Sequence, residues 1–240
     1  MTWLEDFWHR VSEVRPVPDP GVVLGTGVIA LLLVLVPATW RRVRLGITAI
    51  HEAGHAVVAV LVGRRLQGVR LHADTSGVTL SKGRPTGPGM VAMLAAGYLA
   101  PAAVGLGAAA LLAAGRGIAM LWALLALVLA LLAWVRNWYG AALLVLAGLG
   151  LGALTWSAPP EAQSTVAYLV AWLLLIAAPV PLVELLAAGR RRSRTSDPDQ
   201  LARLTRLPGA AWCVLLLVAN LGGLALGVLT LAPDVIDRLR

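Results

Sequence analysis

Charged side chains are scarce in this sequence. Only 13% of its 240 residues are Asp, Glu, Lys or Arg, whereas 59% are hydrophobic. Water-soluble domains usually contain about 25% charged residues, so this composition excludes an ordinary soluble globular protein. Stretches without any charge recur along the chain, and crossing a hydrocarbon core takes roughly 17 to 25 residues of helix. The sequence therefore predicts a protein whose solvent is the lipid bilayer.

Two further absences limit what the chain can be. It has a single cysteine, Cys213, which excludes an intrachain disulfide and which we interpret as a small packing residue. The first twenty residues carry acidic, basic and proline residues, so they lack the apolar centre of a cleavable signal peptide. We expect residues 1–19 to be an interfacial segment with a short amphipathic helix that presents Trp3, Phe7 and Trp8 on one face. A disordered tail is the alternative.

The balance of charge is strongly basic, with a formal net charge of +8. In a soluble chain this would suggest nucleic-acid binding, but here the basic residues lie between apolar stretches. That placement is typical of membrane topology and of contact with anionic lipid headgroups. We therefore expect the lipid bilayer, and no nucleic acid, as the partner of these residues.

Seven uncharged stretches are candidate membrane spans, or six if one of them is re-entrant. The predicted fold class is an all-α polytopic membrane protein with six or seven transmembrane helices. Residues 20–233 form its transmembrane domain, and residues 234–240 form a C-terminal tail. With seven spans, more Lys and Arg fall on the side of the N-terminus, which favours a cytoplasmic N-terminus. The candidates are residues 20–40, 45–63, part of 85–115, 117–135, 137–160, 162–183 and part of 207–233.

Two connecting segments are long enough to have structure of their own. In residues 66–81, apolar residues alternate on either side of a turn sequence from Asp74 to Gly77, which predicts a short β-hairpin at the membrane surface. An edge of this hairpin could hold an unwound substrate strand. The polar loop 188–206 begins with a group of arginines, and Pro198 then marks the start of a short amphipathic helix.

One motif combines two histidines with a glutamate. His51, Glu52 and His55 form an HExxH pattern inside the second apolar stretch. Because residues four apart lie on one face of a helix, both imidazoles can bind the same metal ion, and Glu52 is placed to accept a proton from the attacking water. Chance would produce such a pattern in about one chain in 700 of this composition. An ionisable group at the centre of a membrane helix also costs about 2.5 to 3.5 kcal/mol, so the motif predicts a zinc site with Glu52 as the catalytic residue.

A catalytic zinc ion usually has three protein ligands and a water, so one ligand must come from outside the motif. Asp197 is our first choice, because it lies in a short structured segment between apolar helices. Asp199 and Glu184 are the alternatives. Each of the three also has a structural explanation: a helix cap for Asp197, a favourable charge in the first helical turn for Asp199, and a partner of the following arginines for Glu184.

The predicted topology conflicts with this choice of ligand. With seven complete spans, the start of the HExxH helix and the segment that holds Asp197 lie on opposite faces of the membrane. Either one apolar segment does not cross the bilayer, or Asp197 is not the ligand. Two of the spans contain residues that could break them, namely Pro179 with Pro181 in the sixth and Gly97 with Pro101 in the third.

The sequence around this motif resembles the site-2 protease family of intramembrane zinc metalloproteases, in particular the small bacterial members without a PDZ domain. The resemblance covers most of residues 45–230, and the HExxH motif is its specific part. The other matching residues are 48–50, 53, 54 and 56 around the motif, Gly77 and Val78 in the hairpin, 95–98 with Pro101, and 196–203.

This resemblance implies a protease that cleaves membrane-spanning or membrane-adjacent helices, with His51 and His55 as zinc ligands and Glu52 as general base. It also implies a multi-pass protein of the bacterial cell membrane whose partners are membrane-protein substrates. Members of the family usually take the third zinc ligand from an Asp followed by Gly in a later transmembrane helix. This chain has no Asp-Gly pair, so the resemblance does not identify its third ligand.

Three other functions are compatible with part of the pattern. A catalytically inactive zinc-binding scaffold or regulator of the same fold is expected if no acidic third ligand approaches the metal. A transporter with an intramembrane His and Glu site would show paired polar residues in related halves of the chain, and no such repeat is present. A different membrane protease architecture would use a distant Glu as ligand, for which Glu184 is the candidate. No feature of the sequence specifies the substrate sequence or the oligomeric state.

Overall fold

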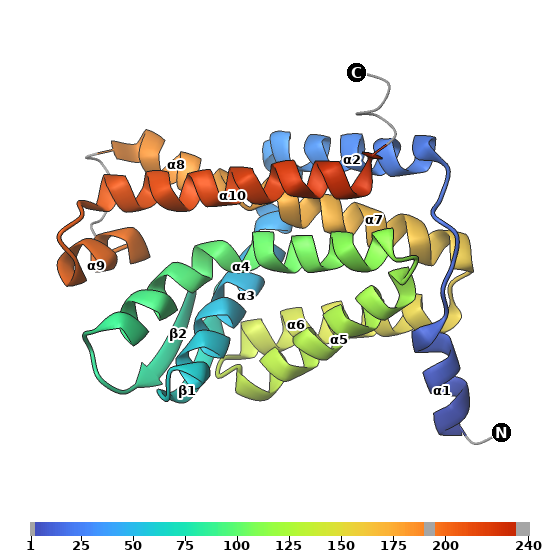
Figure 1. The fold of residues 1–240 in the computed structure, drawn as a ribbon. Coiled ribbons are helices and arrows are strands. Elements are labelled where there is room, and N and C mark those ends of the chain that lie inside the picture. Colours follow the sequence, from blue (N-terminus) through green and yellow to red (C-terminus); the bar gives the residue numbers. More distant parts are fainter. Residues whose placement is uncertain (1–2, 190–194, 234–240) are drawn as a thin grey trace.

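The computed structural model describes residues 3–189 and 195–233 (Figure 1). The predicted C-terminal tail 234–240 and residues 190–194 of the polar loop lie outside these ranges. The described residues form ten helices and one two-stranded antiparallel sheet, with the bounds α1 (Trp3–Ser12), α2 (Pro20–Leu35), α3 (Pro37–Leu61), β1 (Arg65–Leu71), β2 (Gly77–Lys82), α4 (Pro88–Ala113), α5 (Gly117–Trp134), α6 (Trp138–Ser157), α7 (Pro160–Ala177), α8 (Val180–Ala188), α9 (Asp197–Leu204) and α10 (Gly209–Leu231).

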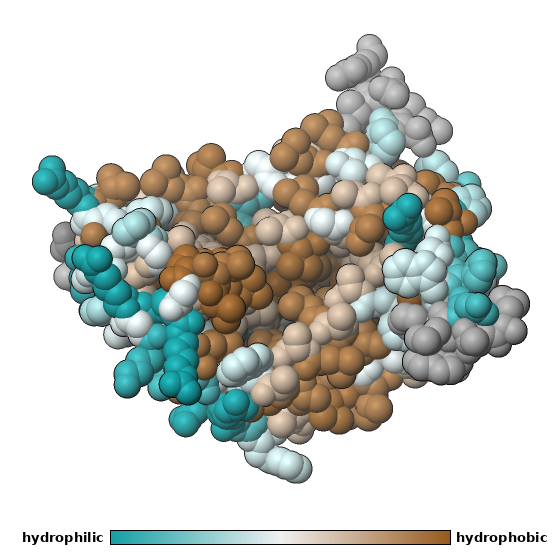
Figure 2. Space-filling model, turned by 60° about the horizontal axis from the view of Figure 1, so that its bottom comes forward, coloured by the Kyte–Doolittle hydropathy of each residue, from teal (hydrophilic) through white to brown (hydrophobic). Residues whose placement is uncertain are grey.

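The predicted all-α polytopic membrane fold is confirmed. In the described ranges, five helical segments are long and apolar enough to cross a membrane: α4, α5, α6, the continuous pair α7 and α8, and α10. A sixth span results if α2 and α3 together count as one. Their outer surfaces are apolar, and Figure 2 shows a broad hydrophobic region with hydrophilic side chains toward its two sides, most densely at the left. Exposed Leu32, Leu146 and Val218 belong to this lipid-facing surface.

The structure corrects the expectation of seven spans. The first two candidates, residues 20–40 and 45–63, are not separate spans, because α2 and α3 follow each other directly and meet at an angle of 101°. Pro37 has no backbone N–H and disfavours helical torsion angles in the residue before it, so Val36 adopts an extended conformation and α2 ends. Arg41, Arg42 and Arg44 consequently lie in the first turns of α3 and not in a loop between two spans.

The predicted hairpin is present and packs on the bundle. β1 and β2 pair with Leu71 opposite Gly77 and Arg65 opposite Lys82, with an irregularity in register between Leu66 and Gly68. The buried residues of β1 pack into a cluster with α3, α5 and α6. In the described part of the chain, β2 pairs with β1 alone, so its other edge carries no strand.

The connecting segments gather at two ends of the bundle. At one end the hairpin meets the α5–α6 turn, where the backbone N–H of Arg136 donates to the carbonyl of Val69 over 2.8 Å, and α9 packs on α4 nearby. At the other end Arg15 follows α1 and donates its backbone N–H to Gly115 in the α4–α5 turn. Figure 1 shows α9 and the hairpin at the left and α1 at the right. The HExxH helix and the segment with Asp197 therefore share one end, and the conflict expected from seven spans does not arise.

Candidate metal centre

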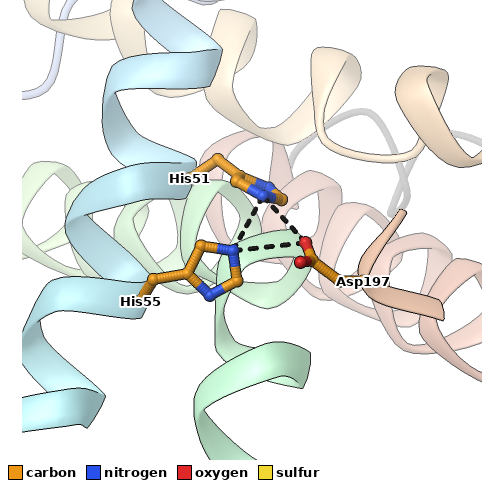
Figure 3. Close-up of side chains that lie close together, drawn as sticks. All are labelled: His51, His55 and Asp197. Carbon is orange, nitrogen blue, oxygen red and sulfur yellow. Dashed lines mark hydrogen bonds and ion pairs between the residues drawn. The ribbon is translucent and has the colours of Figure 1, made fainter. Parts of the chain in front are cut away.

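The two histidines of the HExxH motif converge with Asp197 (Figure 3). His51 and His55 lie one helical turn apart on α3, and their Nε2 atoms are 3.0 Å from each other. Oδ2 of Asp197, at the first residue of α9, lies 3.2 Å from the Nε2 atom of each histidine. His55 is buried, with 5% of its surface exposed, whereas His51 and Asp197 are partly buried. Three donor atoms from two elements thus face one small volume.

The position of Asp197 follows from how α9 begins and packs. Ser196 is the N-cap residue in an extended conformation, and Pro198 occupies the first helical turn, where a missing N–H costs nothing. The amphipathic helix then buries Leu201 against Leu94 of α4 and Leu182 of α8. This contact holds α9 against α4 and directs the side chain of Asp197 toward α3. The structure therefore assigns the helix cap to Ser196 rather than to Asp197.

The orientation of His55 is set from α4. Its Nδ1 atom lies 2.7 Å from the backbone carbonyl oxygen of Met93, which can only accept a hydrogen bond. The proton of the neutral imidazole is thus placed on Nδ1, and the lone pair of Nε2 is directed toward His51 and Asp197. The ring of His51 packs edge to face against Tyr98, with ring centroids 4.7 Å apart.

Two glycines allow α3 and α4 to approach each other at this place. A Cβ atom on Gly54 of α3 would lie 2.5 Å from the Cβ of Ala100 and 2.7 Å from the carbonyl oxygen of Ala96. A Cβ atom on Gly97 of α4 would overlap the imidazole of His55 and would lie 2.7 Å from Nε2 of His51. Any larger residue at either position would force the helices apart or fill the space in front of the histidines.

The donor set fits zinc. Donor atoms bound to a tetrahedral zinc ion at about 2.0 to 2.1 Å are about 3.3 to 3.4 Å from one another. The three distances between donor atoms here are 3.0, 3.2 and 3.2 Å. Two imidazole nitrogens and a carboxylate oxygen are ligands that zinc accepts, and three protein ligands leave the fourth position open, as in catalytic sites. The residues present therefore match a catalytic zinc site in type, number and spacing.

The charge of Asp197 suits a metal ligand. Burial by itself raises the pKa of its carboxyl group, but without a metal the protonated forms of His51 and His55 donate hydrogen bonds and supply positive charge, which outweigh burial and hold the pKa well below its usual value. The ionised carboxylate is the form that binds a cation.

Glu52 lies beside the ligands but contacts the hairpin. Its side chain is 4% exposed, and Oε2 accepts a hydrogen bond of 2.6 Å from the hydroxyl of Thr79 on β2. Glu52, His55 and Asp197 line a cavity of about 300 Å³ that reaches along β2 and past Met93 of α4. The cavity thus connects two of the candidate ligands, His55 and Asp197, with strand β2.

The two alternative ligands are engaged elsewhere. Oδ2 of Asp199 accepts a hydrogen bond of 2.5 Å from the hydroxyl of Ser196, which agrees with a role at the start of α9. Glu184 of α8 accepts hydrogen bonds from the indole of Trp40, over 2.8 Å, and from the guanidinium of Arg44. A cation partner of Glu184 is thus Arg44 on α3, and the arginines at 190–194 that the sequence suggested as its partners lie outside the described residues. In the described ranges, the group of His, Asp and Glu side chains that could hold a metal consists of His51, His55 and Asp197.

Sequence reasoning missed Thr79, Gly97 and Met93 as parts of the site. Thr79 and Gly77 alternate on β2 and share its inner face, so the period of the strand could have pointed to them. Met93 contributes a backbone carbonyl, which no side-chain pattern reveals.

A comparison with protein families gives a match that covers most of the chain. The family model described as Peptidase M50B-like matches residues 24–227, a range that contains both the HExxH motif and Asp197. No curated protein and no solved structure matches the chain.

Proposed function

The chain belongs to the M50B-like peptidase family, and from this premise we propose that it is an intramembrane zinc metalloprotease that hydrolyses peptide bonds in or near transmembrane helices of other membrane proteins. The observation that carries the proposal is the convergence of His51, His55 and Asp197 beside Glu52. Family membership supports the resemblance to site-2 proteases, and the helices support a multi-pass membrane protein.

In this function each side chain has a distinct role. His51, His55 and Asp197 hold the metal ion, and Met93 keeps the Nε2 atom of His55 free for it. The chemistry that zinc supplies at such sites is acidification of water and polarisation of a carbonyl group. Glu52 accepts the proton of the attacking water and passes it to the leaving amine.

The substrate must be unwound before it can react. A helical substrate hides its carbonyl groups in its own hydrogen bonds, so the scissile segment has to become extended. The edge of β2 that carries no strand lines the same cavity as Glu52 and His55. We propose that the extended segment adds to this edge as a third strand, because the main-chain N–H and C=O groups of β2 would replace the lost helical hydrogen bonds.

The distribution of basic residues favours a cytoplasmic hairpin end. A model with six spans places both chain ends on the same face, opposite the hairpin. Lys and Arg are concentrated at the hairpin end, whereas among the described residues the opposite end carries Arg10, Arg15 and Arg116. The positive-inside rule therefore reverses the orientation expected from seven spans. The residues at the hairpin end are Arg64, Arg65, Arg70, Lys82, Arg84, Arg136, Arg203 and Arg206.

Labelling tests this orientation. A membrane-impermeant thiol reagent applied to intact cells should modify Ser12→Cys and leave Lys82→Cys unmodified until the cells are opened. The opposite pattern would place the hairpin end outside the cell.

Two measurements on the purified protein test the proposed function. Wild-type protein should contain about one zinc ion per chain and cleave a model transmembrane substrate, whereas Glu52→Gln should keep the zinc and lose cleavage. Wild type that is loaded with zinc but inert would instead support a scaffold or regulator of the same fold. Wild type that holds no zinc would contradict the assignment of the metal.

A further inference from the structure

Strand β2 holds the side chain of Glu52 by a short hydrogen bond. The Oγ1 atom of Thr79 lies 2.6 Å from Oε2 of Glu52 and 3.1 Å from the backbone carbonyl oxygen of the same residue. A hydroxyl has a single proton to donate, and a distance of 2.6 Å is typical of a charge-assisted bond to a carboxylate. The hydroxyl of Thr79 therefore fixes one carboxylate oxygen of Glu52.

The same strand supports the rest of the Glu52 side chain. A Cβ atom on Gly77 would lie 2.6 Å from both Cγ and Oε1 of Glu52, so the side chain rests directly on the backbone of Gly77. The torsion angles of Gly77 do not require glycine, since its φ is not positive. Glycine is needed at this position because of the close approach alone.

The hairpin is also attached to α3 beyond this contact. The hydroxyl of Thr48, one helical turn before Glu52, donates a hydrogen bond of 2.8 Å to the carbonyl of Thr75 in the hairpin turn. Glu52 thus projects from α3, the helix that carries His51 and His55, onto strand β2, and the hairpin is hydrogen-bonded to the same helix.

We infer that Thr79 is a positioning residue, whose hydroxyl fixes one oxygen of the Glu52 carboxylate so that the other is presented for proton transfer. This inference rests on the proposed function, in which Glu52 is the general base. Strand β2 would then both orient the carboxylate of Glu52 and bind the extended substrate segment. A third strand on β2 would rigidify the segment from Gly77 to Thr79, so that substrate binding and alignment of the base become one event.

Substitutions at Thr79 separate the hydroxyl from the shape of the side chain. Thr79→Val keeps the volume and the branched shape but cannot donate, whereas Thr79→Ser keeps the donor. We expect Thr79→Val to lower kcat by about 10- to 100-fold with little change in KM and full zinc content, and Thr79→Ser to stay within about 5-fold of wild type. Thr230→Val makes the same chemical change on the exposed surface of α10 and should leave both constants unchanged.

A measurement on metal-free protein tests the contact without activity. After removal of metal with a chelator, Thr79→Val leaves the buried carboxylate of Glu52 without its donor and should lower the Tm by about 3 °C or more. In the Glu52→Leu background the same substitution should lower the Tm by clearly less, because only the 3.1 Å contact with the backbone carbonyl of residue 52 is then lost. Equal shifts in the two backgrounds would show that Thr79 does not act through Glu52.

The possible outcomes separate this inference from the proposed function. Suppose that wild type is active. If Thr79→Val then keeps the kcat of wild type, or if Thr79→Ser loses as much activity as Thr79→Val, the inference is wrong and the proposed function remains intact. If neither Thr79→Val nor Thr79→Ala can be purified with zinc, the hydroxyl serves the fold and the inference is wrong. If wild type does not cleave the substrate, or if its cleavage persists in Glu52→Gln, both the inference and the proposed function are wrong.

Discussion

Gly97 of α4 lies directly against His55 of α3, and a Cβ atom on Gly97 would overlap the Nε2 atom that faces Asp197. Gly97→Ala should therefore abolish zinc binding, because the added methyl group fills the space in front of both imidazoles. Zinc content of the purified protein measures this effect. Gly107→Ala in the same helix is the matched control, since a Cβ atom there meets nothing within 4 Å. A Gly97→Ala protein with full zinc content would show that the metal is not bound where the three donors converge.

The assignment of the third ligand predicts a clear difference between two neighbouring acidic residues. Asp197→Asn removes the carboxylate that approaches both histidines and should weaken zinc binding by about 100-fold or more. Asp199→Asn weakens the contact with Ser196 at the start of α9 and should bind zinc as wild type does. Competition with a chelator of known affinity measures both. Equal affinities in the two variants would remove Asp197 from the site.

Glu184 should stabilise the fold without binding the metal. Glu184→Gln weakens the contacts of α8 with Trp40 and Arg44, so the protein should unfold at a lower temperature. The side chains of Arg44 and Glu184 are both partly exposed, so the decrease in unfolding temperature should be small. Zinc content should stay at the wild-type value, and its loss would restore Glu184 as a candidate ligand.

Removal of zinc should destabilise the folded protein. A ligand that binds only the native state raises its stability in proportion to the logarithm of its concentration over Kd. Wild type with zinc should thus have a Tm several degrees above that of chelator-treated protein. In Asp197→Asn this difference should shrink to less than half. A Tm that does not respond to zinc in wild type would argue against a bound ion.

Addition of the substrate to β2 predicts where cross-links form. The native cysteine Cys213 is buried, so a cysteine introduced at exposed Leu80 is the reactive thiol of that variant. With a substrate that carries one cysteine near the scissile bond, Leu80→Cys should form an intermolecular disulfide. Leu146→Cys on the lipid-facing surface of α6 should form far less. Similar yields at the two positions would contradict binding along the strand.

Several features of this protein follow from local patterns. The membrane fold is determined by long apolar stretches, because hydrogen-bonded helices are the form in which such segments enter lipid. His51 and His55 lie on the same face of α3 because they are four residues apart within one helix. The hairpin is determined by alternating apolar residues around a turn, and the structure places its strands within one residue of the predicted ends.

Only the tertiary structure decided the number of spans and brought Asp197 into the site. Asp197, Asp199 and Glu184 carry similar local signals, and nothing in their neighbours says which of them meets a helix 142 residues away in sequence. That meeting depends on the break between Val36 and Pro37, which removes one span and brings both segments to one end of the bundle. It depends as well on Gly54 and Gly97, which let the helices approach closely. Distances across a bundle arise from packing among several elements, and packing has no counterpart in the local order of residues.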